Sequence, residues 1–147
     1  MEPKEEFEFL LADFERESGV KLERQDDGSA ILVVGESGET IVNLELLPTS
    51  RQLLAWARVG NLGDDENAAE RAKYLLSVNI VSYAQSGFVL ALDERNDEVI
   101  AHDIRPLEWF DSADRFAAWL EELIALVTKV RIECEEFYPY VDDEEVE

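Results

Sequence analysis

One stretch decides the fold: residues 75–93 read LLSVNIVSYAQSGFVLALD. Its first part ends a run of apolar residues at helical spacing that extends over residues 66–83. Its second part alternates as a strand does, over residues 88–92. Gly87 stands between the two patterns and suits a turn. We therefore expect a helix that leads directly into a strand, with the other elements placed on either side of this junction.

The C-terminal side of this junction predicts a hairpin followed by a long helix. Asn96-Asp97 turns the chain into a second strand over residues 98–105, which Pro106 ends. The run 111–114, DSAD, is typical of a helix start, because it offers capping side chains and acids for the first turn. Apolar residues then repeat at spacings of four and three up to Phe137. This helix is the longest element that the sequence predicts.

The N-terminal side predicts one helix and three strands. Apolar spacing indicates a helix over residues 4–18. Residues 31–34 and 40–47 form a hairpin around a glycine-rich turn, and a third strand covers residues 52–59. The order is therefore α-β-β-β-α-β-β-α. We expect an α+β fold in which a five-stranded antiparallel sheet carries the three helices on one face.

Composition limits the classes of function that are possible. The 147 residues include 13 Lys and Arg against 35 Asp and Glu, which gives a formal charge of −22. Proteins that bind nucleic acid or anionic membrane surfaces need clustered basic residues, so both classes are disfavoured. With 46% hydrophobic residues the chain is too apolar for the disordered acidic class. We expect one domain over residues 1–138 and a solvated acidic tail over residues 139–147.

The sequence offers no pair of side chains for catalysis and no set of metal ligands. Its one histidine, His102, and its one cysteine, Cys134, fall on different predicted elements. The acid-rich turns do not match a calcium-binding loop, and the turn at residues 35–38 lacks the lysine of a phosphate-binding loop. We predict no enzymatic activity, no metal and no cofactor. With no basic, apolar leader and no long apolar run, the expected location is the cytoplasm.

The apolar residues exceed what a small sheet can bury on one face. The third strand has apolar groups on both faces, with Leu54 and Trp56 on one of them, and the central helix has a broad apolar stripe. A large exposed apolar patch usually marks a surface for a partner protein. The surplus therefore points to protein binding.

The order of elements, the small size and the acidity resemble the class I chaperones of bacterial type III secretion, the CesT/SycE-like Tir chaperone family. Within the deciding stretch, residues 75–79 resemble the family's LL-x-x-N motif at the end of the second helix, and residues 87–93 resemble its fourth strand. The resemblance spans about residues 7–137. It implies a homodimer that holds the N-terminal segment of a secreted effector in extended form, over apolar patches or at a sheet edge, without catalysis.

The resemblance also implies site residues. The dimer contact would be formed by Leu75, Leu76, Asn79, Ile80, Tyr83, Phe88 and Leu90. No motif fixes the client-binding residues, and one candidate patch consists of Leu32, Val34, Leu54 and Trp56.

Three other interpretations remain open. The chain could share this fold as a YbjN-like chaperone or regulatory protein that is not tied to secretion. It could be an acidic mimic of nucleic acid, although eight of its 35 acids crowd the C-terminal end instead of an ordered surface. Enzymatic activity ranks last, because no acid, base and nucleophile are paired.

Overall fold

The computed structural model describes residues 1–141. It contains three α-helices, one short 3-10 helix and six strands. In chain order these are α1 (Pro3–Ser18), β1 (Glu23–Arg24), β2 (Ala30–Val34), β3 (Thr40–Leu47), β4 (Gln52–Asn61), α2 (Ala68–Gln85), β5 (Val89–Asp93), β6 (Glu98–Pro106), η1 (Leu107–Trp109) and α3 (Ala113–Phe137).

The helix ends follow local rules that the sequence carries. Pro3 occupies the first turn of α1, where its missing N–H is not needed, and Gly19 ends the helix in a left-handed conformation with φ of 74°. Ser112 caps α3, because its side chain accepts a hydrogen bond of 3.2 Å from the backbone N–H of Arg115. These caps explain why α1 and α3 begin and end within two residues of the predicted positions.

The sheet is antiparallel throughout, with the strand order β1-β2-β3-β4-β6-β5. It has six strands, so the prediction of five strands is wrong by one. The additional strand is β1, which pairs Glu23 with Ile31 and Arg24 with Ala30. Both residues of β1 are exposed, so no alternation of apolar and polar residues marks it in the sequence.

A bulge in β4 ties the sheet to α3. The register between β4 and β6 shifts between Arg58 and Gly60. The guanidinium of Arg131 on α3 donates to the carbonyls of Arg58 and Val59 at 2.7 and 2.8 Å and to the Thr40 hydroxyl at 2.7 Å. Burial lowers the pKa of Arg131, because the guanidinium loses water that would stabilise its charge.

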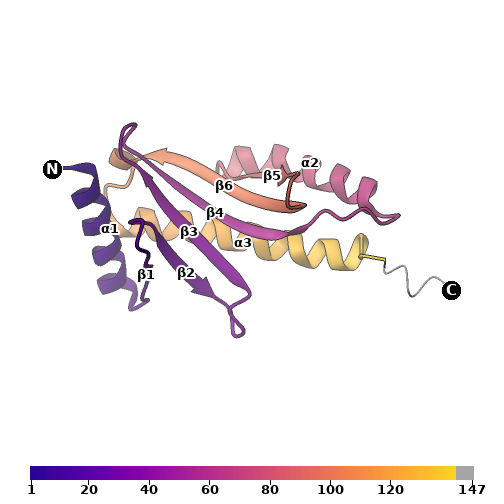
Figure 1. The fold of residues 1–147 in the computed structure, drawn as a ribbon, viewed down its shortest axis with the longest axis horizontal. Coiled ribbons are helices and arrows are strands. Elements are labelled where there is room, and N and C mark those ends of the chain that lie inside the picture. Colours follow the sequence, from indigo (N-terminus) through magenta and orange to yellow (C-terminus); the bar gives the residue numbers. More distant parts are fainter. Residues whose placement is uncertain (142–147) are drawn as a thin grey trace.

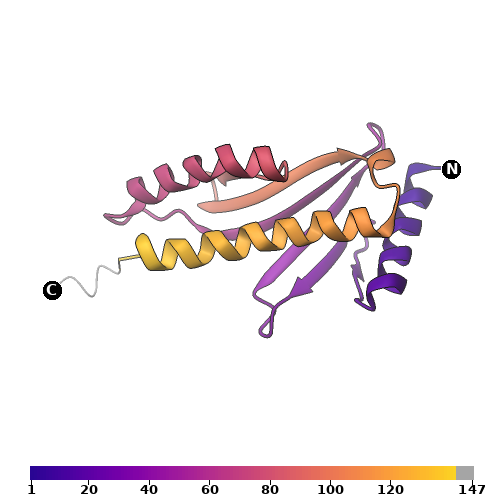
Figure 2. The ribbon, with the colours of Figure 1, turned by 180° about the vertical axis from the view of Figure 1, so that it is seen from behind.

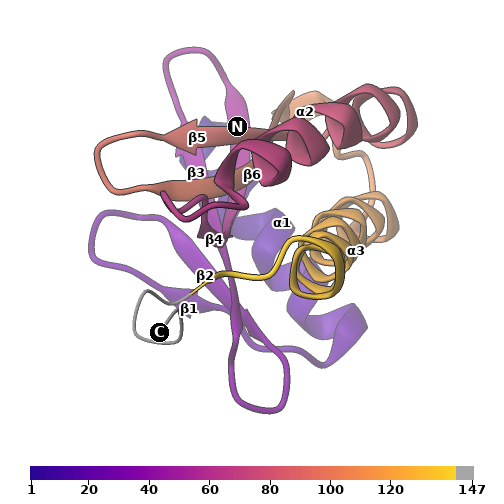
Figure 3. The ribbon, with the colours of Figure 1, turned by 90° about the vertical axis from the view of Figure 1, so that its right-hand side faces the viewer.

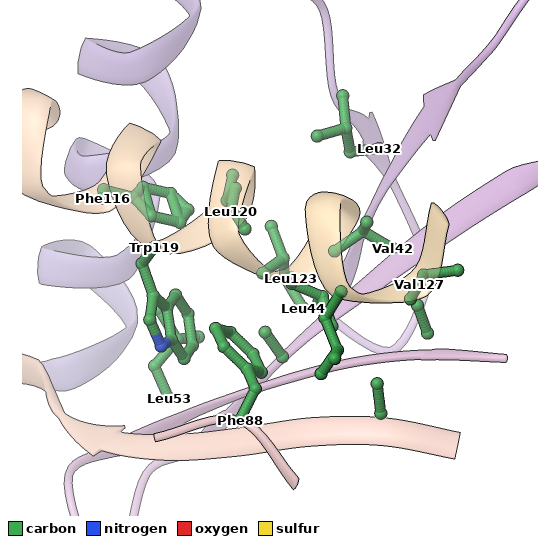
Figure 4. Close-up of a cluster of buried hydrophobic side chains, with 14 of the residues drawn as sticks. Leu32, Val42, Leu44, Leu53, Phe88, Phe116, Trp119, Leu120, Leu123 and Val127 are labelled. Carbon is green, nitrogen blue, oxygen red and sulfur yellow. The ribbon is translucent and has the colours of Figure 1, made fainter. Parts of the chain in front are cut away.

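All three helices lie on one side of the sheet. Figure 2 shows α3 running along the length of the sheet with α2 beside it, and Figure 3 shows the helices together on one side. Side chains of α3 fill the space between this helix and the strands (Figure 4). The fully buried members of this core include Phe116, Trp119 and Leu123 of α3 with Val42, Leu44 and Leu53 of the strands and Phe88. Among residues 1–141, no helix lies on the opposite face of the sheet.

A charged cluster fixes the chain after α1. The Glu15 carboxylate accepts a hydrogen bond of 2.8 Å from Arg24 and another of 2.8 Å from the backbone N–H of Leu22. Both bonds lower the pKa of Glu15, from 4.5 to about 2, and the bond from Arg24 has the larger effect. Because the folded pKa lies below the unfolded one, the cluster stabilises the fold above pH 4.5, and this contribution is lost as the pH falls toward 2.

We expect Glu15→Gln to lower the free energy of unfolding by about 1 kcal/mol at pH 7. The difference from the unmodified chain should shrink steadily between pH 4.5 and pH 2, the interval set by the two pKa values. Urea unfolding of both chains across this pH range measures the difference in the free energy of unfolding. Glu17→Gln, an exposed change on the same helix, serves as the control and should show no such pH dependence. An equal loss at every pH would contradict the role given to Glu15.

Candidate protein-binding surfaces

One side of α2 exposes a row of large apolar side chains. Leu76, Ile80 and Tyr83 are 68%, 77% and 70% exposed. Their spacing of four and three places them in one stripe along the helix. Leu92 of β5 is exposed as well, and it lines the same shallow pocket of about 190 Å³ as Leu76. We call these four residues the helix patch.

The inner side of α2 belongs to the core of the subunit. Leu75 and Leu90 are 8% exposed and Phe88 is fully buried, with its ring 5.6 Å from that of Trp119. These three residues were expected at a dimer contact. In the folded subunit they are already covered, so of the seven expected residues only Leu76, Ile80 and Tyr83 offer large apolar side chains to a partner.

The seventh residue, Asn79, braces the edge of the sheet. Its amide nitrogen donates to the Leu90 carbonyl at 3.0 Å, and its amide oxygen accepts from the Leu90 N–H at 2.6 Å. One turn further along α2, the Ser82 hydroxyl donates to the Phe88 carbonyl at 2.7 Å. Since β5 is an outer strand, these bonds occupy backbone groups that another strand would need. The asparagine of the LL-x-x-N motif therefore closes part of this edge.

We expect Asn79→Ala to lower the free energy of unfolding by about 1–3 kcal/mol, because it leaves both backbone groups of Leu90 without these partners. Urea unfolding followed by circular dichroism measures the change. Ser77→Ala is the matched control, since Ser77 lies on the exposed side of the same helix and bonds only to its own helix backbone at Lys73. Equal stability of the two variants would show that the brace contributes nothing.

The uncovered face of the sheet forms a second apolar surface, which we call the open sheet face. Val33, Ile41 and Ile104 are 48%, 46% and 40% exposed. The apolar surface continues onto half-buried neighbours of these residues. Leu54 on β4 pairs with Ile104 on β6, and Trp56 on β4 pairs with His102 on β6. The Trp56 indole donates to the Glu45 carboxylate at 3.0 Å, which holds the ring on this face. The apolar members are Ile31, Val33, Ile41, Leu54, Trp56, Val89, Ile100 and Ile104.

The four residues expected to form one client patch are divided between the two faces. Leu54 and Trp56 lie on the open sheet face. Leu32 is 5% exposed and packs with the helix-covered core, and Val34, two residues along the same strand, shares that side. Leu32 and Val34 are therefore not part of the surface that Leu54 and Trp56 form, because alternate residues of a strand share a face and the helices cover the face of β2 that bears them.

The two surfaces consist mainly of apolar side chains. Among residues 1–141, no three His, Cys, Asp or Glu side chains lie together in a group that could hold a metal ion. His102 lies on the open sheet face opposite Trp56, whereas Cys134 is buried on α3. Within the same part of the chain, no helix is long and apolar enough to span a bilayer. The surfaces can offer apolar contact and backbone pairing, which suit another polypeptide.

One cluster was not predicted from the sequence. Arg71 on α2 is 1% exposed and pairs with Asp65 at 2.9 Å. The hydrogen bonds that Arg71 donates to the Asp65 carboxylate hold the pKa of Asp65 well below its usual range. A signal was present, since Arg71 stands four residues before the buried Leu75 on the inner side of an amphipathic helix. Its partners Tyr138 and Pro139, which come from the other end of the chain, could not be predicted.

A comparison with protein-family models identifies one family. The model of the Tir chaperone protein (CesT) family matches residues 9–131. No curated protein matches the chain. Solved structures share its fold, among them chains of three complexes.

A chain of the HopA1–SchA chaperone–effector complex aligns with a TM-score of 0.71 and 19% identity, covering 87% of this chain and 94% of that one. A chain of the ExsC–ExsE complex aligns with a TM-score of 0.68 and 20% identity, covering 89% and 95%. A chain of the ExoT–SpcS complex from Pseudomonas aeruginosa aligns with a TM-score of 0.60 and 18% identity, covering 84% and 96%.

Proposed function

Because this chain belongs to the Tir chaperone protein (CesT) family, we propose that it is a secretion chaperone that works in the cytoplasm as a homodimer. It would hold the N-terminal segment of a type III effector in extended form and keep that segment soluble and ready for secretion. The matched structures support this proposal, since they are described as complexes such as HopA1–SchA, a chaperone with its effector. The chaperone would act by binding alone, without turnover.

The observation that carries the proposal is the presence of two separate apolar surfaces on one small subunit. The helix patch lies on α2 and β5, and the open sheet face lies on the side of the sheet away from the helices. A single subunit leaves both in contact with water, which is unfavourable for a soluble protein. In the proposed assembly, a second copy covers the helix patch and the client covers the open sheet face.

The open sheet face suits an extended client for two reasons. Its exposed residues are aliphatic or aromatic, so they can desolvate the apolar side chains of many sequences. Within residues 1–141 the sheet edge beside it is also incompletely paired, because β1 pairs only with Ala30 and Ile31 and no other described strand pairs with the rest of β2 on that side. A client strand could extend the sheet there, whereas Asn79 occupies the edge at β5.

The charge of −22 is consistent with this role. A chaperone with exposed apolar surfaces risks self-association beyond the dimer, and a high net charge of one sign opposes it. This electrostatic term acts on solubility and leaves the fold unaffected.

The experiment that tests the proposal is capture of a client in the native host. Affinity purification of the tagged chain, followed by mass spectrometry, should recover a secreted protein, and limited proteolysis of the complex should leave the N-terminal segment of that protein protected. Recovery without secreted proteins, or protection of a different region, would contradict the proposed function.

A further inference from the structure

The end of the described chain is bound back onto the start of α2 through one buried arginine. Where α3 ends beside the loop into α2 (Figure 1), the Arg71 guanidinium donates to the carbonyl of Tyr138 at 3.0 Å and to that of Pro139 at 3.2 Å. It also donates to the carbonyl of Leu62 and pairs with Asp65. Arg71 therefore joins the start of α2 and the loop before it to residues 138–139, which are far away in the sequence.

Neighbouring groups complete the attachment. Asn67 donates to the Pro139 carbonyl at 2.8 Å, and the backbone N–H of Val141 donates to the Asp65 carboxylate at 3.1 Å. The Tyr140 ring lies 3.9 Å from the Arg71 guanidinium carbon, and its hydroxyl donates to the Asn61 carbonyl. We call residues 138–141 the strap. The Tyr138 ring lies 5.4 Å from the Tyr74 ring of α2, so the strap is held by its backbone and by two rings.

The strap lies against a pocket of about 410 Å³ in which Cys134 is one of the lining residues. Tyr140, Leu75 and Val99 line the same pocket, together with three arginines. Cys134 is only 8% exposed, and burial raises the pKa of its thiol. Both conditions slow the reaction of a thiol with an external reagent.

The attachment is polar and local, which makes it easier to open than the core. Tyr140 remains 51% exposed, so docking of the strap removes little apolar surface from water. When the strap leaves, Arg71 keeps its ion pair with Asp65, and water can replace the carbonyls of Tyr138 and Pro139. Release therefore does not leave a buried charge without a partner.

We propose that residues 138–141 form a releasable strap that closes the pocket over Cys134 while the rest of the fold stays intact. The strap and α2 share Arg71, and α2 also carries the helix patch. Release of the strap is thus a conformational change that connects residues 138–141 with the loop before α2 and with the first turn of that helix. The inference concerns this subunit alone and does not depend on the proposed function.

Thiol labelling of the full-length chain tests the proposal, because Cys134 is the only cysteine. We expect Tyr140→Ala to react with a disulfide reagent at least about tenfold faster than the unmodified chain, since it removes the ring that stacks on Arg71. Asn67→Ala, which removes one hydrogen bond to the strap, should accelerate labelling about fivefold. Ile132→Ala is the matched control: this apolar residue of α3 is 50% exposed, lies outside the strap and should leave the rate unchanged.

Urea unfolding of each variant distinguishes release of the strap from loss of the fold. The proposal requires the labelling rate to rise more than the change in global stability accounts for. It would be overturned if Tyr140→Ala and Asn67→Ala labelled Cys134 at the rate of the unmodified chain. It would also be overturned if labelling in all variants followed global unfolding.

Discussion

Leu76→Asp and Ile80→Asp should each turn a dimer into a monomer at micromolar concentration. Both side chains protrude from α2, at 68% and 77% exposed, so a carboxylate at either position is fully hydrated in the isolated subunit and costs little there. In a dimer that covers the helix patch, the same carboxylate would lose its water. The expected loss is at least about 3 kcal/mol, which corresponds to a weakening of roughly a hundredfold in Kd.

Sedimentation measures this effect, and the helix offers its own control. Val81 is 50% exposed but lies on another side of α2, beside the groove toward α3. Val81→Asp adds the same charge to the same helix and should leave the dimer intact. If both helix-patch variants sediment as the unmodified dimer does, the dimer contact lies elsewhere on the subunit.

The second large effect concerns the open sheet face. We expect Ile104→Asp and Val33→Asp to abolish capture of a client that the unmodified chain retains. These residues are 40% and 48% exposed, so the subunit tolerates the change, whereas a client seated on this face would have to bury the new carboxylate. A loss of about 2–4 kcal/mol would place the complex below detection in a pull-down.

Ile132→Asp is the control for these variants. Ile132 is an aliphatic residue of similar exposure, at 50%, but it belongs to α3 on the other side of the sheet. Quantitative pull-down with the client found in the native host would compare all three variants. Capture that survives Ile104→Asp and Val33→Asp but fails with Ile132→Asp would place the client on the helical side.

The local elements of this fold could be predicted from the sequence because their causes are local. Capping by Ser112, the proline in α1 and the alternation in β3 each act over a few residues. The strand β1 could not be predicted, because its two exposed residues show no alternation of apolar and polar side chains. It forms only because it pairs with the edge of β2. Residues 139–141 were expected in a solvated tail, but they dock through Arg71; the rest of that tail lies outside the described residues.

The apolar stripe of α2 could likewise be predicted, but the side of it that packs inward could not. Leu75 and Leu76 are neighbours of the same type, yet one is 8% exposed and the other 68%. Their exposed fractions differ because α2 is placed beside β5, a position that the hydrogen bonds of Asn79 fix. Leu90 became a core residue for the same reason, whereas Phe88 is covered by Trp119 of α3.

The sequence by itself determined the helices, most of the strands, the family and the surplus of apolar residues. The tertiary structure alone decided which of these residues remain in water. A periodic pattern defines the faces of a helix or strand relative to one another, whereas burial depends on which face another element covers. Leu32 and Trp56 both belong to apolar strand faces, and they differ because α1 and α3 pack on only one side of the sheet.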